Sequence, residues 1–169
     1  MPIPIRTLRE AARAPAPVRK SLREARAQKE RTAFLCHSSK DNDLARGLVR
    51  LLQDGGWRVY VDYEDTALPL TPDRETARRI RDAIRLANFF FLFLASPNSV
   101  QSRWCSWEIG FADGCKNEDQ IWVAQTKESN GTVYGNEYLD LYRNLDISDE
   151  GKLGVWEPGK SEGLVVSAL

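Results

Sequence analysis

Residues Phe89 to Ala95 read FFFLFLA, an unbroken run of apolar side chains. A strand with one face in water would alternate apolar and polar residues, so this run indicates a strand that is covered on both faces. Helices packed on the two sides of a parallel sheet provide such cover. The run therefore predicts the central strand of an α/β domain.

On either side of this run, the sequence alternates between strand and helix patterns. Short apolar runs predict further strands at Thr32–Cys36, Trp57–Asp62, Gln120–Ala124 and Leu153–Trp156. Apolar residues at spacings of three and four predict two helices between them, one after Asp41 as N-cap and one with Thr71 as N-cap and Pro72 as first residue. Strands separated by helices imply parallel crossovers and hence a doubly wound sheet.

The first 31 residues differ in composition from the rest. Formal net charge is zero, but residues 1–31 carry nine basic and three acidic side chains, whereas residues 32–169 carry 15 basic and 21 acidic ones. Four prolines and few apolar residues lead us to expect that residues 1–31 form a basic extension, partly helical or disordered and loosely docked, on a domain of residues 32–169. The functional alternatives are a nucleic-acid-binding or membrane-surface arm, or an organelle transit peptide.

Several protein classes are excluded by features that the sequence lacks. No window approaches the ~18 consecutive apolar residues of a membrane-spanning helix, which excludes an integral membrane protein. The three cysteines form no CxxC pair and no Cys/His cluster spaced for zinc, so we expect a reducing, cytoplasmic environment and no structural metal. No glycine-rich phosphate loop follows the first predicted strand, which disfavours Rossmann dehydrogenases and P-loop NTPases. His37 is the only histidine, and beside Cys36 on a strand it would point to the opposite face, which disfavours a Cys-His nucleophile.

Ligands of a doubly wound sheet bind beyond the carboxyl ends of its strands. Three predicted loops meet there: His37–Asn42, Asp62–Pro69 and Ser96–Glu108. Asp62, Glu64 and Asp65 offer oxygen ligands for Mg²⁺, but such sites also need carboxylates directly after the first strand, so we expect no metal.

Trp104 and Glu108 are four residues apart at the start of a predicted helix, which puts an indole and a carboxylate on one face. An aromatic ring that stacks on a planar base, beside a carboxylate that supports a sugar, suits the cleavage of an N-glycosidic bond. Alternatively, the tryptophan is a core or rim aromatic and Glu108 is an acid favoured by the helix dipole. The turn His37-Ser38-Ser39 likewise has a purely structural interpretation, in which its hydroxyls cap the following helix.

With these residues assembled, the stretch from about Thr32 to about Glu157 resembles the Toll/interleukin-1 receptor (TIR) domain. The first box is carried by AFLCHSSKD at Ala33–Asp41. Further support comes from the strand Trp57–Asp62 with its loop, from Ser96–Ser102, and from the helix start WCSWE at Trp104–Glu108.

The resemblance implies a flavodoxin-like, five-stranded parallel sheet and, as in many bacterial members, NAD⁺ glycohydrolase or ADP-ribosyl cyclase activity. It implies NAD⁺ as substrate and no separate cofactor. By position, Glu108 matches the catalytic glutamate, and Trp104 matches an aromatic residue that stacks on the substrate. Further residues match loops that border the substrate or cover the site, namely His37, Ser38 and Ser39 in the first loop and Asp65 and Thr66 in the second.

Two features depart from the TIR pattern of receptors and adaptors. The second loop lacks the Arg-Asp-x-x-Pro-Gly motif, and no receptor or effector domain fits in 169 residues. A solitary TIR of this kind resembles the signal-producing protein of bacterial antiphage systems such as Thoeris, which implies self-association through TIR–TIR contacts and a separate effector that responds to the product. Neither a membrane nor nucleic acid is expected as a partner. The alternatives are a non-catalytic TIR interaction module and a nucleoside deoxyribosyltransferase-like enzyme.

Overall fold

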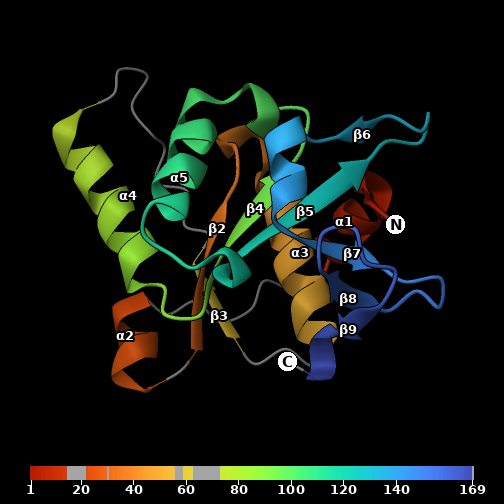
Figure 1. The fold of residues 1–169 in the computed structure, drawn as a ribbon, viewed down its shortest axis with the longest axis horizontal. Helices are drawn as coiled ribbons and strands as arrows, with labels where there is room; N and C mark the ends of the chain where they lie inside the picture. Colours follow the sequence, from red (N-terminus) through yellow and green to blue (C-terminus); the bar gives the residue numbers. More distant parts are fainter. Residues whose placement is uncertain (15–21, 30, 56–58, 63–72, 169) are drawn as a thin grey trace.

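The computed structural model describes residues 1–14, 22–29, 31–55, 59–62 and 73–168. Its sheet has the strand order β3-β2-β4-β5-β7-β8-β9, and β1 and β6 both pair with β5 (Figure 1). The strands are β1 Ile3–Pro4, β2 Arg31–Cys36, β3 Val59–Asp62, β4 Phe90–Ala95, β5 Ile121–Lys127, β6 Val133–Tyr134, β7 Arg143–Ile147, β8 Leu153–Trp156 and β9 Gly163–Val165. The α-helices are α1 Ile5–Ala11, α2 Leu22–Ala27, α3 Asn42–Asp54, α4 Arg74–Leu86 and α5 Arg103–Asp113. The succession of parallel strands β3-β2-β4-β5-β7, with helices on both faces, confirms the doubly wound α/β prediction.

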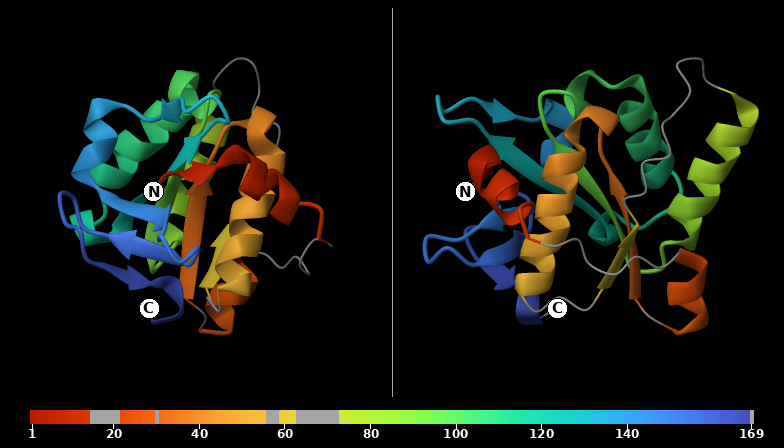
Figure 2. Two further views of the ribbon diagram at one scale, coloured as in Figure 1. Left: turned by 90° about the vertical axis from the view of Figure 1, so that its right-hand side faces the viewer. Right: turned by 180° about the vertical axis from the view of Figure 1, so that it is seen from behind.

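The central strand β4 is buried along its whole length. Its side chains alternate between two separate core clusters, with Phe90, Leu92 and Leu94 in one and Phe91, Phe93 and Ala95 in the other. Helices α1 and α3 cover the first face, and α4 and α5 cover the second (Figure 2). Complete burial of both faces explains why the apolar residues Phe90–Ala95 do not alternate with polar ones.

Helix α3 follows the predicted spacing. Leu44, Leu48 and Leu52 are four residues apart and at most 1% exposed, so one stripe of the helix faces the sheet. The helix ends at Gly55, whose N–H donates to the carbonyl of Leu51. Its N-cap residue is Asp41, as predicted, although the Asp41 side chain makes no capping hydrogen bond.

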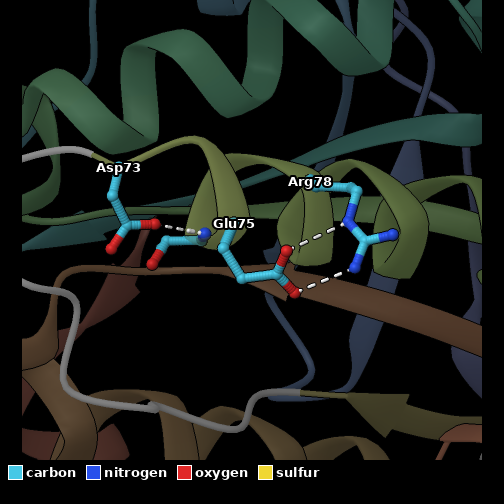
Figure 3. A network of polar contacts seen from close by, with 4 residues as sticks. Asp73, Glu75 and Arg78 are labelled. Atoms are coloured by element: carbon cyan, nitrogen blue, oxygen red, sulfur yellow. Dashed lines mark hydrogen bonds and ion pairs between the residues drawn. The ribbon is translucent and has the colours of Figure 1, made fainter.

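The cap of α4 differs from the prediction. Asp73 is the N-cap, and its Oδ1 accepts a 2.6 Å hydrogen bond from the backbone N–H of Thr76 (Figure 3). In the next turn Arg78 forms a two-bond ion pair with Glu75. The expectation of Thr71 as N-cap is therefore wrong, because a carboxylate two residues later performs that role. Thr71 and Pro72 lie outside the described residues.

The fifth parallel strand is β7, not the predicted segment Leu153–Trp156. β7 pairs with β5 in parallel, whereas Leu153–Trp156 forms β8, which is antiparallel to β7. The reason is the short connection: five residues separate the two strands, and a parallel crossover needs about a dozen or more. The connection is a tight turn in which Gly151 has a φ of +79° and its N–H donates to the carbonyl of Ser148.

The start of the chain is packed into the core, contrary to the expectation of loose docking. β1 pairs in parallel with the end of β5, and Ile3 and Leu8 are fully buried. Helix α1 lies directly against α3 (Figure 2), so close that a Cβ added at Gly47 would lie 1.9 Å from the carbonyl oxygen of Leu8. Helix α2 lies in the second half of this segment, which agrees with the expectation that the segment is partly helical. No helix among the described residues combines the length and apolar character that crossing a bilayer requires.

Candidate functional site

Glu108 lies on the buried face of α5. Ser102 caps this helix by accepting a 3.3 Å hydrogen bond from the N–H of Cys105, and the residues that then face the sheet are Cys105, Glu108, Ile109 and Ala112. Glu108 is only 5% exposed, and the other buried residues of α5 (Cys105, Ile109 and Ala112) belong to a hydrophobic core cluster. The first turn of α5 contains no acidic residue, and Glu108 lies beyond it, so the helix dipole does not account for an acid at this position.

The surroundings of Glu108 disfavour its charged form. Burial raises its pKa from 4.5 to about 7, and a hydrogen bond with the Cys36 side chain acts in the opposite direction. Cys36 is the last residue of β2 and points to the same face of the sheet as α5. The Glu108 carboxyl is therefore placed at the carboxyl end of a central strand, where both of its protonation states are accessible near neutral pH.

Trp104 begins an aromatic row on α5. Its ring meets Trp107 edge-on at a centroid distance of 5.7 Å, and Trp107 stacks on Phe111 at 6.1 Å. All three rings are partly exposed, and they pack against the core cluster that contains Cys36 and Cys105. Trp104 is therefore an aromatic residue at the rim of the core. Its ring is partly exposed and lies one turn before Glu108 on the same helix.

The turn after β2 is ordered by its own side chains. Ser38 caps the short 3₁₀ helix η1 (Ser39–Asp41), with its Oγ 3.4 Å from the N–H of Lys40. His37 Nε2 lies 2.9 Å from Asn42 Oδ1, and its Nδ1 lies 3.3 Å from the carbonyl oxygen of Leu35. A neutral imidazole has one N–H, so it donates to only one of these two acceptors. Ser38 and His37 are partly exposed and Ser39 is exposed at this edge.

Asp41 is the N-cap residue of α3, as the sequence predicted, but its side chain makes no capping hydrogen bond to the start of that helix. Instead its carboxylate, 3% exposed, accepts hydrogen bonds from Ser96 Oγ at 2.5 Å and from Asn98 Nδ2 at 2.6 Å. Ser99 completes the network by donating from its Oγ to the carbonyl of Leu94. The network joins the loops after β2 and β4, and sequence reasoning missed it although both loops had been singled out.

The remaining predicted site residues, Asp65 and Thr66, lie outside the described residues. Within the described ranges, no group of three or more His, Cys, Asp or Glu side chains is placed to hold a metal ion. All three cysteines are free, with Cys36 and Cys105 buried and Cys115 exposed.

Comparison of the sequence with known proteins identifies a family. The TIR domain family profile matches residues 33–152, which include the turn after β2 and helix α5. The chain belongs to the TIR domain family. It is also similar to a curated protein of Bacillus cereus (strain MSX-D12) named "Probable 3' cyclic ADP-D-ribose synthase ThsB'", with 35% identity over 111 residues. That match covers 64% of this chain and 57% of the relative, so the chain aligns with little more than half of the relative's length.

Proposed function

We propose that this TIR chain cleaves NAD⁺ at the bond between nicotinamide and ribose and converts the ADP-ribose into a cyclic or otherwise modified signalling molecule. The observation that carries the proposal is the buried carboxyl of Glu108 on α5, with a pKa of about 7, at the carboxyl end of the parallel sheet. The similarity to a curated protein named as a cyclic ADP-ribose synthase supports the same class of reaction.

The chemistry of this bond requires little from the protein. Nicotinamide leaves NAD⁺ as a neutral molecule, so no general acid has to protonate it. Positive charge develops on the ribose ring as the bond breaks, and a carboxylate nearby stabilises that charge. In its ionised form Glu108 would accept hydrogen bonds from the ribose hydroxyls and face the developing charge.

Burial of Glu108 strengthens its interaction with a positive charge that comes to lie against it. An ionised carboxylate in apolar surroundings is unfavourable when it lacks a cationic partner. A cationic ribosyl group supplies that partner, so the carboxylate interacts more strongly with the transition state than with water or a neutral ligand. Arrival of the positively charged nicotinamide ring also favours ionisation of Glu108.

The other proposed roles follow the positions of the side chains. Trp104 offers a partly exposed ring for stacking on a planar group of the substrate. His37, Ser38 and Ser39 border the ribose from the loop after β2. For Asp65 and Thr66, which lie outside the described residues, a role in substrate binding is proposed from the TIR sequence pattern alone. Glu108 is the one catalytic residue in this proposal.

The test is mass spectrometry of small molecules after the purified protein is incubated with NAD⁺ at high protein concentration. We expect nicotinamide and an ADP-ribose isomer from the wild type and from Glu162→Gln, an exposed glutamate that serves as the matched control. Glu108→Gln keeps the shape of the side chain and removes its charge, and we expect it to lose turnover. Full turnover by folded Glu108→Gln would overturn the assignment, and no turnover by assembled wild type would favour a non-catalytic interaction module.

We further propose that the chain self-associates through TIR–TIR contacts, acts in the cytoplasm, and produces a diffusible signal for a separate effector in antiphage defence. Analytical ultracentrifugation with and without NAD⁺ tests the self-association. Survival of phage-challenged cells that express wild-type or Glu108→Gln protein with its genomic neighbours tests the defence role. Equal survival of the two would contradict a catalytic role in defence.

A further inference from the structure

Asp41 connects the two parts of the candidate site. One part is the turn His37–Ser39 after β2, and the other is helix α5, which carries Trp104 and Glu108. Both parts lie beyond the carboxyl edge of the sheet, after two neighbouring parallel strands, β2 and β4. Their relative position depends on the contacts that join the two loops.

The first link runs from Asp41 back to the turn. The backbone N–H of Asp41 donates a 2.8 Å hydrogen bond to the carbonyl of Ser38. The Oγ of Ser38 in turn accepts from the N–H of Lys40 at 3.4 Å. These two bonds close the short helix η1 directly after His37, so the Asp41 backbone is fixed relative to the turn that precedes it.

The second link runs from the Asp41 side chain to the loop after β4. Its buried carboxylate accepts hydrogen bonds from Ser96 Oγ and Asn98 Nδ2. Ser96 and Ser99 hold each other, because the Oγ of each accepts a bond from the backbone N–H of the other, at 3.0 and 2.8 Å. A hydroxyl has one hydrogen to donate, and that of Ser99 goes to the carbonyl of Leu94 at 2.6 Å. The hydrogen of Ser96 is therefore left for Asp41.

The third link runs from Ser99 to helix α5. The carbonyl of Ser99 accepts a 3.0 Å hydrogen bond from the N–H of Ser102. Ser102 then caps α5 through the N–H of Cys105. Glu108 follows one turn later on the same helix. A continuous series of hydrogen bonds thus leads from the turn after β2, through the Asp41 carboxylate, to the helix that carries Glu108.

We propose that Asp41 is a positioning residue, whose carboxylate sets the place of helix α5, with Trp104 and Glu108, relative to the turn His37–Ser39. Its catalytic meaning rests on the proposed function, whereas its hold on the two loops does not. A small displacement of a catalytic group from the reacting atoms lowers the rate strongly. Loosening the network should therefore reduce kcat, with a smaller change in KM.

Three variants separate positioning from charge. Asp41→Ala removes the acceptor, and Asn98→Ala removes one donor from the opposite loop. Asp41→Asn keeps the shape of the side chain without its charge. Its Oδ1 can still accept from Asn98, and its amide can donate to Ser96 Oγ, which then turns its own hydrogen to Ser99 Oγ, 3.0 Å away. Gly47→Ala is the matched control for lost stability, because it disturbs the contact of α1 with α3 and leaves the network intact.

Hydrogen exchange followed by mass spectrometry measures the loops without substrate. We expect peptides of residues 37–42 and 96–106 to exchange about tenfold faster in Asp41→Ala, and to stay close to wild type in Asp41→Asn. In Asn98→Ala, residues 37–42 should also exchange faster, although the substitution lies in the other loop. Unchanged exchange of residues 37–42 in Asn98→Ala would overturn the inference, and this variant carries the test if Asp41→Ala does not fold. Equal acceleration in Gly47→Ala would overturn it too, since general loss of stability would then explain the change.

A second readout, the kinetics of nicotinamide release, separates this inference from the proposed function. At a temperature where all variants are folded, kcat should fall about tenfold or more in Asp41→Ala, recover in Asp41→Asn and stay at the wild-type value in Gly47→Ala. An Asp41→Asn variant with protected loops and the kcat of Asp41→Ala would overturn the inference, because charge would then explain the effect. If kcat is unchanged while the loops of Asp41→Ala are loosened, the inference fails and the function stands. If the loops respond as expected but the wild type releases no nicotinamide, the proposed function fails and the hold of Asp41 on the loops stands.

Discussion

Asn98 donates a 2.6 Å hydrogen bond from Nδ2 to the carboxylate of Asp41, 57 positions earlier in the chain. Asp41 follows β2 and Asn98 follows β4, so the bond connects two neighbouring strand ends at the edge of the sheet that carries the candidate site. Ser96 donates to the other carboxylate oxygen. A buried carboxylate held by two donors fixes both loops relative to Glu108 and its helix.

Removing this carboxylate should destabilise the fold. Asp41→Ala leaves the donors on Ser96 and Asn98 without their acceptor, and we expect a loss of about 2–4 kcal/mol in the free energy of unfolding. Urea denaturation measures it. The matched control is Asp43→Ala, which removes an exposed carboxylate paired with Arg9 at the surface and should cost less than about 1 kcal/mol. Similar losses in the two variants would show that the network contributes little.

The contact of α1 with α3 predicts a second large effect. In Gly47→Ala the new methyl group would lie 1.9 Å from the carbonyl oxygen of Leu8, so α1 must move away from α3 and part of the core is exposed. We expect a loss of about 2 kcal/mol or more by urea denaturation. Gly110→Ala is the control, because a Cβ there meets nothing within 4 Å and should stabilise helix α5 by up to about 1 kcal/mol.

Sequence patterns were sufficient for the parts of the fold where local chemistry and tertiary structure agree. The FFFLFLA run could be placed as the central strand because both of its faces are buried. β7 could not be recognised, since its sequence RNLDI has only two apolar residues and its pairing with β5 depends on tertiary contacts. The core role of Ile3 and Leu8 was hidden for a similar reason: their partner helix and strand lie far away in the sequence.

At the candidate site, the sequence points to individual residues but not to their contacts. The WCSWE motif singles out Glu108 as the candidate catalytic residue, and the structure shows that its side chain is buried. Cys36, whose side chain affects the pKa of Glu108, lies 72 positions earlier in the chain, so no local pattern indicates this pairing. The N-cap position of Asp41 is a local pattern that the sequence shows, whereas its side-chain partners Ser96 and Asn98 come from another loop and leave no local signal.

Stacking by Trp104 should appear in substrate binding. Trp104→Ala removes a partly exposed ring, and if that ring stacks on NAD⁺ we expect KM to rise about tenfold. Trp104→Phe keeps a smaller ring and should lie between wild type and Trp104→Ala. Steady-state kinetics of nicotinamide release measure both. Trp107→Ala is the control for packing, because Trp107 contacts both Trp104 and Phe111. An equal rise in KM in Trp107→Ala and Trp104→Ala would mean that the row of rings acts only through packing.

The cap of α4 predicts a pH-dependent contribution to stability. The pKa of Asp73 is lowered, mainly by the backbone N–H of Thr76, so the ionised cap is favoured in the folded state. Its contribution is present above the ordinary value of 3.8 and is lost as pH falls through the lower folded value. Asp73→Ala should lower Tm at pH 7 and Asp73→Asn should lower it less, because asparagine also caps helices. Thermal unfolding followed by circular dichroism at pH 7 and pH 3 should show the difference between wild type and Asp73→Asn shrinking at the lower pH.

Glu108 should act on stability in the opposite direction. Its pKa rises from 4.5 to about 7 on folding, so between these values the folded protein binds more protons than the unfolded chain, and stability falls as pH rises. Glu108→Gln removes this dependence. The free energy of unfolding of Glu108→Gln relative to wild type should therefore increase between pH 4.5 and pH 8, by about 3 kcal/mol at most. Urea denaturation of both proteins across this range measures the difference, with Glu162→Gln as the exposed control. A difference that stays flat with pH would mean that the carboxyl is solvated in solution, and the argument that a buried carboxylate gains its cationic partner from the substrate would fail with it.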